Sequence, residues 1–153
     1  MEAKVRVQAE PFDTAAETAS LTIGRRDIGA VVAFTGLCRD EGGRLAALEL
    51  EHYPGMAEAE IARVAGDAAA RWPLLGLTII HRFGRVDPGD PIVLVLAASS
   101  HRRAAFEAAD FLMDYLKTRA PFWKREHLSD GSTGSWVDAK EADERASGRW
   151  VGR

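Results

Sequence analysis

Apolar residues recur along this chain with two periods, which divide it into strands and helices. Residues 4–9 and 45–53 alternate apolar and polar side chains, as strands with one buried face do. Residues 30–37 form a continuous apolar run rich in β-branched side chains, which predicts a buried strand. The other expected strands are 77–83, 92–98, 122–127 and 135–139. Helical spacing of apolar residues predicts helices at 56–72 and 100–117.

Turn and capping residues separate these elements. Residues 87–90, Asp-Pro-Gly-Asp, predict a hairpin between two of the strands. Asp13 or Thr14 can cap a short helix, and Glu17 is placed to complete a capping box from Thr14. Pro121 stops the long helix. The pattern therefore predicts a chain that mixes helices and strands.

Length and composition limit the class of protein. At 153 residues the chain fits one domain, 1–153, with a charged tail from about 140 to 153 that could be helical. The net charge of -3 gives no sign of nucleic-acid binding, so an anion site must be a local arrangement of cations. The single cysteine excludes an internal disulfide and a multi-cysteine metal site. No apolar stretch is long enough to span a membrane, and we expect a cytoplasmic protein.

The densest chemistry lies in residues 114–126, DYLKTRAPFWKRE. Four cations, Lys117, Arg119, Lys124 and Arg125, surround an apolar Ala-Pro-Phe-Trp turn. A surface helix has no need of a Pro-Phe-Trp run, and a core has no need of so much positive charge. The combination indicates a pocket that holds an anion and places amines beside apolar walls.

Lys117 and Lys124 are the catalytic candidates of this segment. Lys117 ends the long helix and Lys124 lies within the strand after the proline turn, so both can converge on one cavity. A lysine beside aromatic walls and other cations loses its proton more easily, which makes it a usable base or nucleophile. The alternatives are a favourable cation at a helix C-terminus for Lys117 and the solvent face of an edge strand for Lys124.

A second group of cations, His101-Arg102-Arg103, follows Ser99-Ser100 at the expected start of the long helix. Free N–H groups and the helix dipole favour an anion there, and Arg and His side chains add charge-assisted hydrogen bonds. Cations at a helix N-terminus oppose the dipole at roughly 0.3–1 kcal/mol each, which a bound phosphate would offset. The alternative is an ordinary helix cap with solvated basic neighbours.

Arg39 and the remaining reactive side chains give weaker signals. Arg39 lies in a short glycine-bordered loop, where it can close over a ligand or serve as a surface charge. Cys38 has no second cysteine beside it, which favours a bystander thiol over thiol chemistry. His52 and His81 fall within strand patterns and have no Asp or Glu at metal-ligand spacing, so we expect no metal.

Several stretches, in order along nearly the whole chain from about residue 5 to residue 150, match one known family. They are Phe34-Thr35-Gly36 with Arg39, LEHYPGM at 50–56, HRFG at 81–84, PGD at 88–90, SSHRRAAFEA at 99–108, MDYLKTRAPFWKRE at 113–126 and Trp136-Val137. The APFWK run with its upstream lysine and the His-Arg pair is highly specific in combination. On these residues the chain resembles the large, catalytic subunit of molybdopterin synthase, the MoaE family.

The resemblance implies a fold, a reaction and partners. The fold would be α+β, an antiparallel sheet with packed helices in a single domain of the α/β hammerhead type. The chain would form a central homodimer, and a small ubiquitin-like, MoaD-like sulfur-carrier subunit would insert a Gly-Gly tail ending in a thiocarboxylate. The substrate would be cyclic pyranopterin monophosphate and the product the dithiolene molybdopterin, made by a sulfurtransferase with no cofactor.

The resemblance also assigns roles to residues. Lys117 is implied as the principal catalytic amine, and Lys124 as the partner that neutralises the thiocarboxylate or polarises the substrate. His101 and Arg102 are implied to bind the pterin phosphate, and Arg39 to contact substrate. The remaining implied substrate contacts are Arg125 and Glu126.

Two other functions stay open on the sequence. The chain could be a non-catalytic module that binds a ubiquitin-like tail or a phosphorylated ligand. Alternatively, Cys38 could itself carry the sulfur, in which case its removal would abolish turnover. Retention of two lysines on an aromatic turn favours the enzyme.

Overall fold

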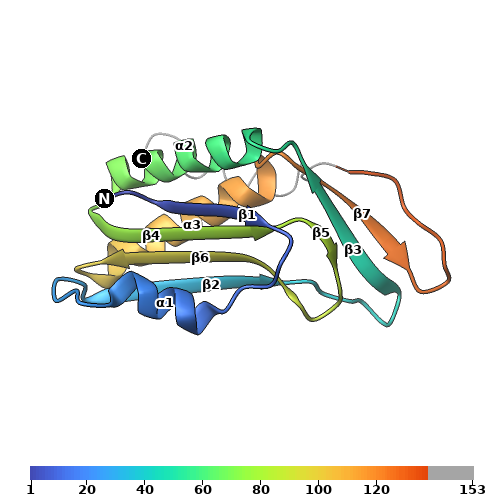
Figure 1. The fold of residues 1–153 in the computed structure, drawn as a ribbon, viewed down its shortest axis with the longest axis horizontal. Helices are drawn as coiled ribbons and strands as arrows, with labels where there is room; N and C mark the ends of the chain where they lie inside the picture. The colour runs from blue at the N-terminus through green and yellow to red at the C-terminus, as the bar shows by residue number, and fades with distance from the viewer. Residues whose placement is uncertain (138–153) are drawn as a thin grey trace.

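The structure, a computed structural model, describes residues 1–137 and shows two sheets joined side by side (Figure 1). The charged tail expected at 140–153 lies outside the described residues. The strands are β1 (Lys4–Gln8), β2 (Ala30–Leu37), β3 (Leu45–His52), β4 (Leu74–Arg82), β5 (Gly84–Val86), β6 (Pro91–Ser99) and β7 (Phe122–Leu128). The helices are α1 (Thr14–Thr22), α2 (Met56–Arg71) and α3 (Arg102–Thr118).

The larger sheet has the strand order β1-β4-β6-β2, and the smaller sheet has the order β5-β3-β7. All pairings are antiparallel except that of β1 with β4, which is parallel. The expected α+β fold is therefore confirmed, with one parallel pair in an otherwise antiparallel arrangement. The predicted hairpin is also present, because β4 and β6 pair antiparallel. Their connection contains β5, an unpredicted strand that leaves the larger sheet and pairs with β3.

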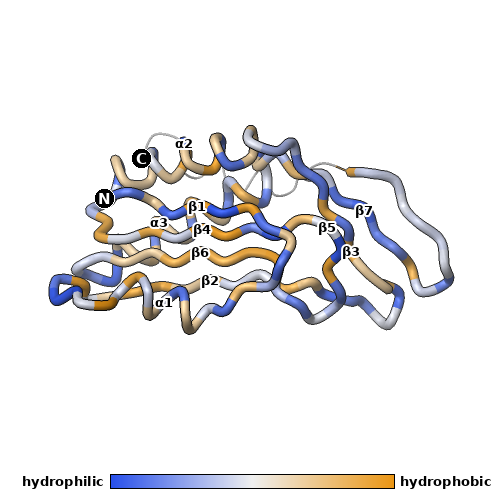
Figure 2. The backbone as a smooth tube through the Cα atoms, viewed as in Figure 1, coloured by the Kyte–Doolittle hydropathy of each residue, from blue (hydrophilic) through white to orange (hydrophobic). Residues whose placement is uncertain are grey.

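Helices cover both faces of the larger sheet. Helices α2 and α3 pack on one face over a core that includes Ile79 and Val95, and α1 packs on the other over Ile80 and Leu94. Successive residues of a strand point to opposite faces, so the central strands must be apolar on both. Figure 2 shows this contrast: β6 is largely apolar along its length, whereas β7 in the smaller sheet is largely polar.

Strand β2 differs from its prediction in burial. Its bounds match the expected 30–37, but within residues 1–137 it pairs only with β6 and forms an edge of the larger sheet. Phe34 and Leu37 are consequently 39% and 56% exposed. A continuous apolar run predicted burial, and the structure instead leaves this strand only partly covered by residues 1–137.

Asp13, one of the two expected caps of α1, is confirmed, whereas the expected capping box and one expected strand differ in the structure. Asp13 caps α1 by accepting a hydrogen bond from the Ala16 N–H at 3.1 Å, so Thr14 forms no capping box. The Glu17 carboxylate instead pairs with Arg6 and Lys4 of β1. The strand expected at 135–139 is reduced, within the described residues, to an isolated bridge between Val137 and Lys124.

Candidate functional site

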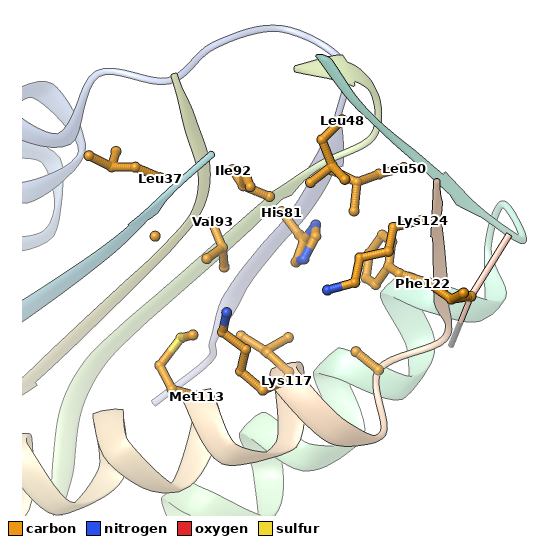
Figure 3. A pocket seen from close by; sticks show the side chains of 14 residues that line it. Leu37, Leu48, Leu50, His81, Ile92, Val93, Met113, Lys117, Phe122 and Lys124 are labelled. Atoms are coloured by element: carbon orange, nitrogen blue, oxygen red, sulfur yellow. The ribbon is translucent and has the colours of Figure 1, made fainter. Parts of the chain in front are cut away.

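A cavity of about 110 Å³ opens where the two sheets meet the C-terminal end of α3 (Figure 3). One wall is aliphatic and comes from three strands. It consists of Leu37 of β2, Leu48 and Leu50 of β3, and Ile92 and Val93 of β6. The site therefore depends on both sheets holding their positions.

Lys117 and Lys124 face each other across this cavity. Lys117 lies in the last turn of α3 and Lys124 lies in β7, and Figure 3 shows both side chains directed into the open space. The chain between them turns sharply at Pro121, after Ala120 has packed into the core. The alternation of β7 then places Phe122 and Lys124 on the cavity side. The structure thus brings together the two lysines singled out in the sequence.

His81 of β4 is a cavity residue that sequence reasoning missed. Its ring stacks on Phe122 with centroids 3.9 Å apart and an interplanar angle of 15°. Burial lowers the pKa of His81 to about 4, and the nearby charges of His52 and Lys117 act in the same direction. A hydrogen bond with the Arg82 carbonyl opposes this shift only in part. The imidazole is therefore neutral at physiological pH.

The ionisable side chains that line the cavity within residues 1–137 are two lysines and one neutral histidine, and no carboxylate of these residues lines it. No group of three or more His, Cys, Asp or Glu side chains within residues 1–137 is arranged to hold a metal ion. The arrangement suits an anion with an apolar portion, as the composition of 114–126 predicted.

Arg125 lies on the other face of β7, away from the cavity. Its Nε donates to Glu49 Oε1 at 3.0 Å, and its guanidinium lies 4.5 Å from the centroid of the Trp136 ring. His127 Nε2 approaches the same Glu49 oxygen at 2.8 Å. These bonds, that of His127 first, lower the pKa of the Glu49 carboxyl. Arg125 and Glu126 do not line the cavity in this structure, and the Glu126 side chain is exposed.

His101 and Arg102 lie at the far end of α3. Fifteen residues separate Arg102 from Lys117, which at about 1.5 Å per residue is about 22 Å along the helix. His101 is the N-cap residue but makes no side-chain capping bond, and both side chains are exposed. Within one chain this pair is too distant to share a ligand with the two lysines.

Arg39 and Cys38 follow the cavity residue Leu37. The Arg39 side chain is 80% exposed and pairs with Glu41 at 2.5 Å, so it is available at the surface next to the cavity. Cys38 is buried, with its Sγ 3.8 Å from the Val86 carbonyl oxygen. Burial raises the pKa of the Cys38 thiol, and nearby Asp carboxylates add to the shift. A buried thiol held in its protonated form is a poor nucleophile.

Comparison with known proteins gives the family. The model of the MoaE protein family matches residues 7–119. The chain belongs to the MoaE family. It is 69% identical over 146 residues to a molybdopterin synthase catalytic subunit of Mesorhizobium japonicum, covering 95% of this chain and 92% of that protein. It is 50% identical over 151 residues to the Escherichia coli protein of the same name, covering 97% and 99%.

Solved MoaE structures have the same fold. A molybdopterin biosynthesis MoaE protein from Burkholderia ambifaria superposes with a TM-score of 0.84 at 47% identity, over 97% of each chain. Molybdopterin synthase from Staphylococcus aureus superposes with a TM-score of 0.77 at 30% identity, over 86% of this chain and 94% of that one. None of the helices within residues 1–137 has the length and apolar character needed to span a bilayer.

Proposed function

We propose that this chain is the catalytic subunit of a molybdopterin synthase, a cytoplasmic sulfurtransferase of molybdenum cofactor biosynthesis. It transfers sulfur from the thiocarboxylated C-terminus of a small ubiquitin-like subunit to cyclic pyranopterin monophosphate, forming the dithiolene of molybdopterin. The observation that carries the proposal is the two-lysine cavity in a chain of the MoaE family.

The two lysines supply charge where both reactants are anionic. A thiocarboxylate and a phosphate are attracted more strongly to ammonium groups in a partly enclosed site than in water. Lys117 acts as the principal amine and moves protons at the reacting centre, while Lys124 neutralises the thiocarboxylate or polarises the substrate. The aliphatic wall on the opposite side restricts water, which favours transfer of sulfur over hydrolysis of the thiocarboxylate.

His101 and Arg102 enter the site from a second copy of the chain. The length of α3 keeps them away from the cavity of their own chain, so the expected phosphate contact requires a homodimer. An exposed apolar surface supports such a dimer: Phe34 on the edge strand β2 is 39% exposed, and Phe106 on the adjoining α3 is 60% exposed. Arg39, at the rim, is placed to contact substrate. Arg125 holds Glu49 behind the cavity and supports β7.

The test is an assay of dithiolene formation from purified chain, thiocarboxylated small subunit and cyclic pyranopterin monophosphate. Lys117→Ala is expected to lower the rate by about 100-fold or more, as loss of a proton-transferring group does. Lys4→Ala is a matched control, because Lys4 lies on β1 and pairs with Glu17. Its rate should equal that of the wild type. A folded wild-type protein that binds the small subunit without forming product would support the non-catalytic binding module instead.

A further inference from the structure

Of the two ring nitrogens of His81, Nδ1 forms a hydrogen bond within residues 1–137 and Nε2 does not. Nδ1 lies 2.8 Å from the Arg82 carbonyl oxygen. A carbonyl only accepts, so Nδ1 carries the ring hydrogen and Nε2 of the neutral ring carries a lone pair. No residue from 1 to 137 forms a hydrogen bond with Nε2. The side chain is nonetheless only 7% exposed, and it lines the cavity.

The Nε2 lone pair accepts a hydrogen bond strongly, unlike the other side chains that line the cavity within residues 1–137. Lys117 and Lys124 are hydrogen-bond donors only. The other lining side chains are apolar, and Met113 offers no more than a weakly accepting sulfur. Among the lining residues within 1–137, Nε2 of His81 is therefore the one strong side-chain acceptor. Because the ring lines the cavity, a donor group of a molecule that enters the cavity can satisfy this acceptor.

We infer that His81 is a further ligand-binding residue, whose Nε2 accepts a hydrogen bond from an N–H or O–H group of the molecule whose anionic end the two lysines hold. The inference rests on the proposed function, which supplies two molecules of this chemistry. One is the tail of the small subunit, with an amide N–H beside its terminal thiocarboxylate. The other is the pterin substrate, with ring N–H groups and a phosphate.

The surroundings of the ring keep it in the accepting form. Phe122 of β7 covers one face of the ring, Lys117 of α3 and Lys124 of β7 border the same cavity, and His52 of β3 lies near enough to oppose a further positive charge. Figure 3 shows the His81 ring among the lining side chains, above the tips of Lys117 and Lys124 in this view. A carboxylate at this position would neutralise a lysine. A neutral acceptor selects for a donor and adds no negative charge beside Lys117.

The experiment measures binding of three ligands to the intact protein. They are a peptide ending in Gly-Gly with a free carboxylate, cyclic pyranopterin monophosphate, and sulfate, which is an anion with no hydrogen to donate. His81→Phe keeps a ring against Phe122 and removes the acceptor, whereas His81→Gln restores an acceptor near the position of Nε2. The matched control is His127→Gln, since His127 pairs with Glu49 on the opposite face of β7.

We expect His81→Phe to weaken one of the two donor-bearing ligands by about three- to tenfold, the usual worth of one hydrogen bond, and to leave sulfate binding unchanged. His81→Gln should recover most of that loss, and His127→Gln should bind all three ligands like the wild type. The ligand that loses affinity identifies the source of the donor. Equal loss for sulfate would mean that the ring only shapes the cavity, and would overturn the assignment, as would unchanged binding of both donor-bearing ligands.

A measurement on the wild type does not depend on whether a variant folds. The imidazole ¹⁵N resonances of His81 at pH 7 should show a protonated Nδ1 and a bare Nε2, and the Nε2 resonance should shift when the donor-bearing ligand is added. An Nε2 resonance that is indifferent to a bound ligand overturns the inference while the proposed function stands. A wild-type protein that binds neither the peptide nor the pterin overturns both.

Discussion

At the scale of the residue, burial decides the charge of His81. Its pKa is lowered to about 4 from an ordinary value of 6.5. Between these pH values His81 is mostly protonated in the unfolded chain and mostly neutral in the folded protein. The stability that depends on the neutral ring is fully present above pH 6.5 and declines as the pH falls toward 4. Linkage puts the loss between pH 7 and pH 5 at about 2 kcal/mol.

His81→Phe should remove this pH dependence. We expect the free energy of unfolding of the wild type to fall by about 2 kcal/mol more than that of the variant between pH 7 and pH 5. Urea denaturation of both proteins at the two pH values measures the difference. All other side chains are the same in the two proteins, so the difference between their pH profiles reports the substitution at His81. Parallel pH profiles would show that the folded ring does take up a proton in this range.

Cys38 is expected to be dispensable for turnover. The thiol is buried and its pKa is raised, so removing it leaves the chemistry intact. Cys38→Ala should retain activity within about twofold of the wild type, and lose about 1 kcal/mol of stability through the small cavity it leaves. The dithiolene assay and a thermal melt measure the two effects. Loss of turnover in a folded variant would point to a sulfur carried on this chain.

The residues of the site were predictable to different degrees. Lys117 and Lys124 could be found because they belong to a group of cations around an apolar turn. Neither a surface helix nor a core explains that composition. The substrate contact of Arg125 was instead implied by the family resemblance, and within one chain the pleat of β7 directs its side chain toward Glu49. His81 could not be found from periodicity, because β4 is buried on both faces and its pattern does not say which face borders a cavity.

At the scale of the element, the bounds of most strands and helices could be predicted within a few residues. Apart from the hairpin of β4 and β6, which strands pair with each other could not be predicted. Strand β2 is as apolar as a central strand, so the sequence does not reveal that the described residues leave one of its edges unpaired. The three-residue strand β5 is too short to show a period, and it exists because β3 pairs with it. Pairing partners depend on contacts distant in sequence, and local patterns carry little information about those.

Substitution of two glycines tests how closely the backbone before β2 approaches the backbone before α3. A Cβ at Gly29, just before β2, would lie 2.1 Å from the Ser100 carbonyl oxygen, and backbone cannot move aside as a side chain can. A Cβ at Gly66, within α2, would meet nothing within 4 Å. We expect Gly29→Ala to destabilise by about 1–3 kcal/mol. Gly66→Ala should stabilise by about 0.5–1 kcal/mol. Urea melts measure both, and equal effects would contradict the close approach of residues 29 and 100.

At the scale of the whole molecule, α3 carries half of the proposed site at each end. If Arg102 serves the cavity of the partner chain, Lys117→Ala and Arg102→Ala each disable both sites of their own homodimer. A mixed dimer of the two variants contains one site with both residues intact and one with neither. Random exchange of subunits should therefore restore about a quarter of the wild-type sites.

The measurement is the dithiolene assay after the two inactive variants are unfolded together and refolded. A matched control mixes Lys117→Ala with Lys124→Ala, whose substitutions fall in the same cavity and cannot complement across a dimer. Recovery in the first mixture alone is the expected result. Equal inactivity of both mixtures, with dimers present, would show that each cavity works with the residues of a single chain.

The length of α3 determines whether a ligand bound at one site of such a dimer influences binding at the other. If each cavity is completed at the opposite end of the partner's helix, the reacting centres stand about one helix length, roughly 22 Å, apart. Electrostatic forces in physiological salt fade over about 8 Å, so the anions bound at one centre are screened from the other. Titration of both sites should therefore be non-cooperative, with a Hill coefficient of about one. The helix that unites the two chains would also keep their chemistry independent.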